Sequence, residues 1–130
     1  MPTTIPAVPI VFEILEQTTP KYTATITDDA GVAIPAASLT TLTIRLWVLK
    51  SDGTTTYIRG SLATGQSVLN ANNTTVSAGG AVVWSLQAAD TTLVEDLPFE
   101  RHVAVWEWTW GTARVGRHEA VFNIQRLAGI

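Results

Sequence analysis

The stretch from Arg101 to Gln125 constrains the fold of this chain more than any other. It reads RHVAVWEWTW, then GTARVG, then RHEAVFNIQ, so two runs rich in valine and aromatic residues flank a short connection bounded by glycines. This pattern predicts a β-hairpin. Trp106, Trp108 and Trp110 recur at every second position. Because side chains alternate between the two faces of a strand, the three rings are expected on one face.

The composition agrees with a chain built of strands. Threonine, alanine and valine dominate, and Lys21 and Lys50 are the only lysines. β-branched residues fit the pleated surface of a sheet, whereas a helical protein would carry more glutamate, lysine and leucine. Charged residues make up only 15% of the sequence, which is low for a protein whose whole surface meets water. We therefore expect part of the surface to contact other protein.

Other segments show the alternation or the turn residues of strands. Leu39 to Leu49 is apolar on one face throughout and on both faces towards its end, which predicts a central strand. Asp52-Gly53 follows it and predicts a tight hairpin turn. Asp90 is expected to cap a short helical turn. The remaining expected strands cover residues 21–27, 54–59, 74–76 and 81–87.

These elements predict an all-β fold. About seven to nine strands are expected from turn signals that recur roughly every ten residues. No segment predicts a long amphipathic helix that would cover a sheet, so two sheets must bury each other. The expected architecture is an immunoglobulin-like β-sandwich, with a jelly roll or a small barrel as the alternative.

The first twenty residues differ from the rest of the chain. Four prolines punctuate them and threonines cluster around the prolines, a composition that forbids a helix and favours an extended backbone. We therefore expect an extended N-terminal arm over residues 1–20, followed by the sandwich over residues 21–130.

The arm is apolar. Ile5, Val8 and Ile10 are interspersed with its prolines, and a disordered tail usually carries more charge and fewer apolar residues. This favours an arm that docks on a neighbouring subunit. The alternative is a disordered terminus that becomes ordered at Phe12, and the residues 10–16 are also consistent with a short strand.

Composition excludes several classes of function. The chain has no cysteine, so it has no disulfide and no cysteine-based metal site or nucleophile. Its net charge is −3, so non-specific binding to nucleic acid is not expected. Its apolar runs are too short to span a membrane, and its N-terminus lacks the pattern of a secretory signal. We expect no cofactor.

The two histidines are expected at the surface. A hairpin turn over residues 112–115 would place His102 opposite the region of Gln125, and His118 opposite Trp108 or Thr109. The two imidazoles would then lie too far apart to bind one metal ion. We expect each of them to be solvated or to lie at an interface.

The acidic residues suggest no catalytic site either. Glu107 and Glu119 fall near each other across the hairpin, and paired carboxylates can transfer protons or bind a cation. Arg114 and Arg117 are close as well, so an exposed ladder of salt bridges explains the group without catalysis. No serine lies in the context of a nucleophile. We therefore expect no enzymatic activity.

The tryptophan row has three interpretations. One or two of its rings can belong to the core, they can form a subunit interface, or they can form an open platform for sugars. Trp110 lies at the hairpin tip, where little core remains to receive it. The interface candidates at the tip are therefore Trp108, Trp110, Arg114 and Arg117.

Short motifs in the second half of the chain carry a family resemblance. The run from Asn70 to Gln87 reads NANNTTVSAGGAVVWSLQ. Further motifs are Ala89-Asp90, His102-Val103-Ala104, Glu107-Trp108-Thr109-Trp110, Gly116, His118-Glu119 and the final FNIQRL. Together, over residues 40–127, they resemble small immunoglobulin-like virion structural proteins of tailed bacteriophages. The proline-rich arm is not part of the resemblance.

The resemblance implies a non-enzymatic structural protein of a bacteriophage particle. Such a protein acts through subunit interfaces as a capsid decoration or cement protein, or as a neck or tail component. The implied partners are other virion proteins and further copies of the chain, not nucleic acid or membrane. The implied location is the virion, after synthesis in the host cytoplasm. The alternative is a module that binds carbohydrate or a host surface through exposed tryptophans.

Overall fold

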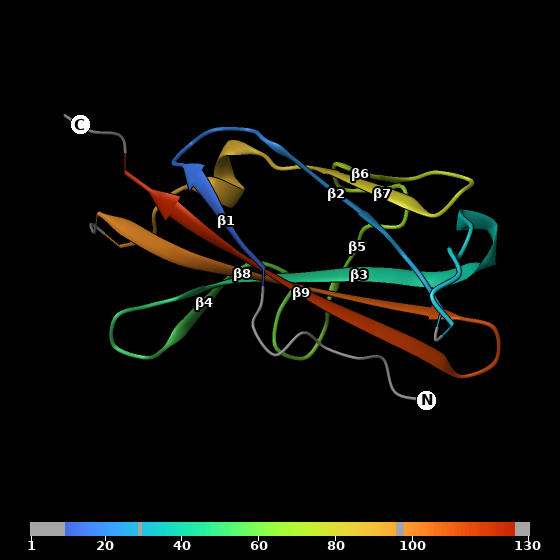
Figure 1. Cartoon of the computed structure of the whole chain (residues 1–130). Helices are drawn as coiled ribbons and strands as arrows, with labels where there is room; N and C mark the ends of the chain where they lie inside the picture. The colour runs from blue at the N-terminus through green and yellow to red at the C-terminus, as the bar shows by residue number, and fades with distance from the viewer. Residues whose placement is uncertain (1–9, 29, 96–97, 127–130) are drawn as a thin grey trace.

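The computed structural model describes residues 10–28, 30–95 and 98–126, and it shows two β-sheets that lie face to face (Figure 1). The larger sheet has six strands and the smaller has three. Two short 3-10 turns are the only helical elements in these three ranges. The predicted all-β sandwich is confirmed, and its nine described strands fall within the expected number.

The larger sheet has the strand order β1-β9-β8-β3-β4, and β5 pairs with β3. Its strands are β1 (Ile10–Leu15), β3 (Leu39–Leu49), β4 (Thr55–Arg59), β5 (Gln66–Ser67), β8 (Phe99–Trp110) and β9 (Arg114–Gln125). The smaller sheet has the order β2-β7-β6, with β2 (Lys21–Thr25), β7 (Ala81–Ser85) and β6 (Thr74–Val76). The 3-10 turns are η1 (Ala36–Ser38) and η2 (Ala88–Thr91).

Strand β3 forms as its alternation predicts. Its buried side chains point towards the smaller sheet, and it lies between β8 and β4, so its predicted central position is confirmed. The turn after it is also confirmed. Gly53 has a φ of +85°, a conformation that glycine adopts without strain, and the Lys50 amide donates to the Thr54 carbonyl oxygen across the turn. The Asp52 carboxylate accepts from the Thr54 amide and hydroxyl.

The β8–β9 hairpin is present, but its turn lies closer to the N-terminus than expected. Trp110 and Arg114 form the last pair of the ladder, so residues 111–113 make the connection. The expected turn over 112–115 is wrong. A three-residue connection needs a backbone that reverses quickly, and both Gly111 and Ala113 adopt a φ of +57°.

The new register changes the partners of both histidines. His102 pairs with Phe122, not with the end of β9, and His118 pairs with Trp106, not with Trp108. Trp106, the partner of His118, lies four positions along β8 from His102, fewer than the predicted register implies. The two histidines are still separated along the strands, as expected.

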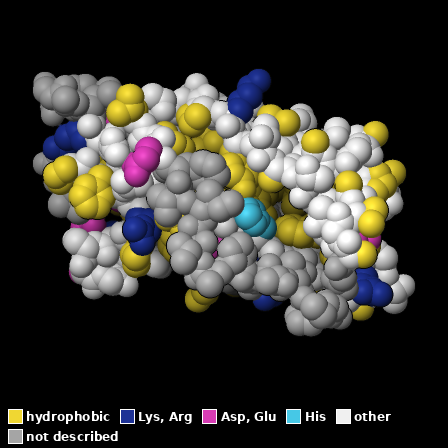
Figure 2. Space-filling view, viewed as in Figure 1, with side chains coloured by type: hydrophobic (Ala, Val, Ile, Leu, Met, Phe, Trp, Pro, Cys, Tyr) yellow, Lys and Arg dark blue, Asp and Glu magenta, His cyan; other side chains and the backbone are white. Residues whose placement is uncertain are grey.

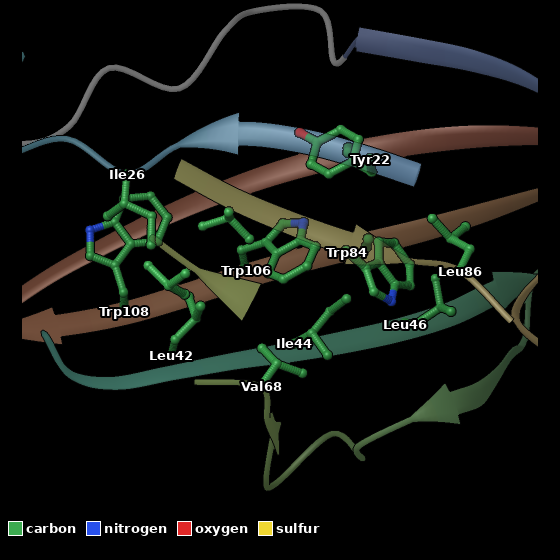
Figure 3. Close-up of a cluster of buried hydrophobic side chains, with 14 of the residues drawn as sticks. Tyr22, Ile26, Leu42, Ile44, Leu46, Val68, Trp84, Leu86, Trp106 and Trp108 are labelled. Carbon is green, nitrogen blue, oxygen red and sulfur yellow. The ribbon is translucent and has the colours of Figure 1, made fainter. Parts of the chain in front are cut away.

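The core fills the space between the two sheets (Figure 3). Trp84 of the smaller sheet packs edge-on against Trp106 of the larger one, with ring centroids 5.3 Å apart and an interplanar angle of 79°. Phe122 packs on Trp84 in a similar geometry, with centroids 5.8 Å apart. Edge-to-face pairs of this kind add to the stabilisation that comes from buried apolar area. The aromatic centre predicted for the hairpin is therefore shared with β7.

Strand β1 changes the boundary of the predicted arm. Ile10–Leu15 pairs with β9 in parallel at the end of the strand order of the larger sheet, so residues 10–15 belong to the sandwich and not to a separate arm. Parallel pairing joins segments from opposite ends of the chain, and alternation in a single strand does not reveal it. Ile5 and Val8 lie outside the described residues, whereas the backbone of Ile10 pairs with Ala120.

Candidate interface at the hairpin tip

The end of the sandwich at the β8–β9 turn carries a surface hollow of about 520 Å³. It lies between the hairpin tip and the turn that follows β2. Its lining residues are Asp28, Ala30, Trp110, Gly111, Thr112 and Arg114. Two of the four interface candidates predicted at the tip, Trp110 and Arg114, are therefore brought together at one site.

The turn on the other side of the hollow is shaped by Asp28. Its carboxylate accepts from the amide of Ala30 at 2.9 Å and from the amide of Val32 at 3.0 Å. Aspartate often organises a turn in this way because its short side chain reaches the backbone two residues on. The bridge between Thr27 and Ala33 closes the loop at its base. The turn thus holds the carboxylate of Asp28 beside the hairpin tip.

The lining combines apolar and charged groups. Trp110 is partly exposed and also packs against the core, so its ring is held in place from behind. Asp28 and Arg114 contribute opposite charges. The volume falls within the range of small ligand sites, and tryptophan and arginine are enriched among residues that dominate binding energy at interfaces. The hollow can therefore receive a partner's side chain that is largely apolar and ends in a polar group.

The other two tryptophans of the row belong to the core. Trp106 is 4% exposed and Trp108 is 7% exposed, whereas Trp110 alone of the three reaches the surface. Trp108 also covers the backbone of Gly116, where an added Cβ would collide with the indole ring. The row therefore does not form an open platform, and the core interpretation is confirmed for two of its three rings. Trp108 has little surface left to offer a partner.

The charged residues of the hairpin form a surface pair beside the tip. The guanidinium of Arg117 donates to the carboxylate of Glu107 at 2.6 Å, and both side chains reach water. Glu119 pairs with Val105, two positions from Glu107 on the same face of β8. The predicted exposed salt bridge is confirmed for Arg117 and Glu107. Exposed pairs of this kind contribute little to stability because water screens them.

His118 is half-buried between the two sheets. Its Nε2 lies 2.7 Å from the hydroxyl of Tyr22, and the two rings stack with centroids 6.4 Å apart. Burial lowers the pKa of the His118 imidazole below its ordinary value, while the carboxylate of Glu119 offsets part of that change. Burial also raises the pKa of the Tyr22 phenol. The pair closes the gap between β2 and β9.

At the opposite end of β8, charged side chains are buried in a connected group that we call the closed end. Arg59 binds Asp90 through two parallel hydrogen bonds of 2.6 Å and 2.7 Å. It also donates to the side chain of Gln66 at 2.9 Å, and its guanidinium lies 5.8 Å from the ring centroid of Trp84. Both partners of the pair are almost fully buried. The prediction that Asp90 is the N-cap of this helical turn is wrong, because Gln87 occupies the N-cap of η2 and Asp90 lies at position N3.

His102 belongs to the same group, so its predicted surface position is wrong. The side chain is fully buried. Its Nδ1 lies 2.9 Å from the carbonyl oxygen of Asp90, and its Nε2 lies 2.7 Å from the carboxylate of Glu100. Glu100 is also buried and accepts from the amides of Val94 and Glu95, both at 2.8 Å. The hydrogen-bonding groups of this pair are satisfied internally, and neither side chain faces solvent.

Sequence reasoning missed the closed end because its members are not neighbours in sequence. The Arg59–Asp90 pair spans 31 residues, and Glu100 and His102 lie on a strand whose alternation places them on the inner face. That alternation was the available signal. Both residues share the phase of Trp106 and Trp108, so a charged residue in this phase has to be buried and paired.

The described residues offer no alternative site for a metal ion. No group of three or more His, Asp or Glu side chains is placed to hold one in the part of the chain that the structure describes. Across those same ranges, no helix is long and apolar enough to cross a membrane. Charged side chains are scattered over the face seen in Figure 2 and form no large field of one sign. The chain matches no protein-family model and no curated protein.

Proposed function

We propose that this protein is a non-enzymatic structural protein of a tailed bacteriophage particle, and that the hairpin tip is its contact with a neighbouring virion protein. It would serve as a capsid decoration protein or as a component of the neck or tail. The single observation that carries the proposal is the hollow at the tip, where Trp110, Asp28 and Arg114 line one surface depression.

Three features support a role in binding rather than in catalysis. Among the described residues that line the hollow there is no histidine, and the carboxylate of Asp28 accepts hydrogen bonds from the turn that it shapes. The buried charged groups of the closed end are paired with one another and face no solvent. The low charge of the chain suits a protein that buries much of its surface in an assembly.

The same hollow also suits a sugar. Aromatic rings stack on the apolar face of a pyranose, and carboxylate, hydroxyl and guanidinium groups bind its hydroxyls. Trp110, Asp28, Thr112 and Arg114 supply these groups. This second function, carbohydrate binding, uses one tryptophan, because the other two of the row are buried.

Oxidative footprinting of tryptophan tests the proposal. Particles purified from the strain that carries this gene should contain the chain as a stoichiometric component detectable by mass spectrometry. In the free protein, Trp110 should react with hydroxyl radicals, whereas Trp106 and Trp108 should not. In particles, Trp110 should become protected, while the partly exposed Trp47 serves as a reference.

Three outcomes are informative. Absence of the chain from particles would overturn the virion assignment. A Trp110 that is equally reactive in particles and in the free protein would overturn the assignment of the contact to the tip. Protection of Trp110 by a soluble oligosaccharide, without any change in particles, would establish the carbohydrate function instead.

A further inference from the structure

We propose that the outer face of the larger sheet is a binding site for a proline-rich segment in the polyproline II conformation, and that residues 1–9 of the same chain occupy it. The outer face is the one turned away from the smaller sheet. The site is built around the aromatic pair of Trp47 and Tyr57. The inference goes beyond the contact at the hairpin tip, and it holds whatever partner that tip binds.

Four apolar side chains form a row across the outer face, which we call the apolar row. Tyr57 of β4 pairs with Trp47 of β3. Trp47 also pairs with Val103 of β8, which in turn pairs with Val121 of β9. Directly paired residues of neighbouring strands project from the same face of a sheet. Because Trp47 follows Leu46, which belongs to the core, the row points away from the smaller sheet.

The two valines of the apolar row are buried although they face away from the core. Val103 is 8% exposed and Val121 is 4% exposed, and neither belongs to the cluster between the two sheets. The smaller sheet lies against the other face, so it does not cover them. Their burial points to a cover on the outer face, and that cover should be apolar where it meets the valines.

The other half of the apolar row is an aromatic pair that suits proline. The rings of Trp47 and Tyr57 are both partly exposed, with centroids 5.7 Å apart and planes inclined at 54°. Aromatic-lined surfaces bind proline-rich segments, because a polyproline II helix is preformed and loses little entropy on binding. The row therefore offers rings on which proline can pack, next to valines that suit an aliphatic side chain.

Residues 1–9 have the composition of such a ligand. They read MPTTIPAVP, with three prolines and no charged side chain. A polyproline II helix repeats every three residues, so Pro2, Ile5 and Val8 would share one face. Proline has no N–H to donate to a neighbouring strand, so the segment suits the face of a sheet better than the position of an additional strand.

The segment also starts in the right place and is long enough. The backbone of Ile10 pairs with Ala120, which precedes Val121 of the apolar row. From β1 to β4 the strand order contains four spacings, which amount to about 19 Å. Nine residues of polyproline II extend about 28 Å. Residues 1–9 can therefore reach the aromatic pair, and attachment to the same chain raises their effective concentration above that of a free segment.

Paramagnetic broadening in the full-length protein tests the site. The chain has no cysteine, so a nitroxide on Thr4→Cys labels one position, which lies off the face that would carry Val8. The backbone amide signals of Trp47 and Tyr57 should be broadened. Adding Val8→Asp should lower the ratio of bound to free segment by at least about tenfold, because a carboxylate replaces a buried aliphatic group. Thr3→Asp is the matched control, since it adds the same charge on a different face and should retain the broadening.

A mixture of chains identifies which chain supplies the segment. Spin-labelled chains without ¹⁵N are combined with ¹⁵N chains that carry no label. We expect no broadening in the ¹⁵N chains, because each keeps its own segment on the apolar row. Broadening there would overturn the assignment to the same chain and would assign the segment to a neighbouring copy. Absence of broadening in the first experiment, or equal broadening with Val8→Asp and Thr3→Asp, would overturn the site itself.

Discussion

Charged and ring-bearing side chains lie at both ends of strand β8, but they are buried and paired at one end and line the surface at the other. At its start, Glu100 and His102 are buried, and their hydrogen-bonding groups contact other parts of the protein. At its other end, Trp110 lines a surface hollow with Arg114 and Asp28. A titratable or aromatic residue is therefore no indication of a binding site by itself. What distinguishes the ends is whether the groups are already satisfied inside the fold.

The two ends should also differ in whether their side chains contribute to the stability of the fold or to the binding of a partner. The closed end joins four segments that are distant in sequence, so its side chains should matter most for folding. The tip belongs to one hairpin and to one neighbouring turn, so its exposed side chains should matter most for a partner. Substitutions at the two ends test this difference between folding and binding, and their expected effects on stability decrease in the order given.

Arg59→Met should have the largest effect. It removes one partner of a buried ion pair and leaves the Asp90 carboxylate without its counter-charge. Loss of one partner of such a pair costs about 3–5 kcal/mol, measured as the change in the free energy of unfolding in urea. The matched control is Arg117→Met, which breaks the exposed pair with Glu107 and should cost less than about 1 kcal/mol. Equal effects of the two substitutions would contradict the account of the closed end.

Gly116→Ala should have the next largest effect. The added methyl group would collide with the indole ring of Trp108, which is buried and cannot move aside freely. Overpacking of this kind costs about 1–3 kcal/mol, which thermal or urea unfolding would detect. Gly79→Ala is the control, because its Cβ would approach no atom closer than 3.8 Å, and it should leave stability nearly unchanged. If Gly116→Ala left the stability of the protein unchanged, Trp108 would not pack on β9 as described.

The burial of His118 predicts that stability depends on pH. Because burial depresses its pKa in the folded state, the unfolded chain binds the proton first as the pH falls. Stability should therefore decrease as the pH falls from 7 through the folded-state pKa of His118. His118→Gln should reduce this loss in urea titrations at pH 7 and pH 5. If the variant lost as much stability between pH 7 and pH 5 as the wild type, His118 would not be the source of that loss.

Trp110→Ala should have the smallest effect on stability among these substitutions. The ring is only partly buried, at the edge of the core, so its loss should cost less than Gly116→Ala. The unfolding midpoint in urea should stay close to that of the wild type. A loss comparable to that of Arg59→Met would show that Trp110 is a core residue and that the tip has no separate binding role.

Much of the fold could be predicted because its strongest signals are local. The alternation of Leu39–Leu49 identified the central strand with its observed bounds, and Asp52-Gly53 identified its turn. The β8–β9 hairpin was predicted from its two arms. Its register was not, because a turn that begins at Gly111 rather than Thr112 depends on backbone angles that several sequences tolerate.

The parts that could not be predicted depend on contacts between distant segments. Nothing in the alternation of Ile10–Leu15 indicates that it pairs in parallel with β9. Likewise, Arg59 and Asp90 each look like surface residues until the fold brings them together. For the candidate site, two tip residues were predicted, whereas Asp28 was not among the predicted site residues. Its position beside the hairpin depends on how the two sheets pack.

Incorporation of variants into particles tests the central claim most directly. Trp110→Ala is compared with Phe99→Ala, which removes an exposed aromatic ring at the closed end. Both variants should fold. We predict that Trp110→Ala enters particles at least about tenfold less than the wild type, as expected for a residue that dominates an interface, whereas Phe99→Ala enters at the wild-type level. Equal incorporation of the two variants would contradict the assignment of the contact to the hairpin tip.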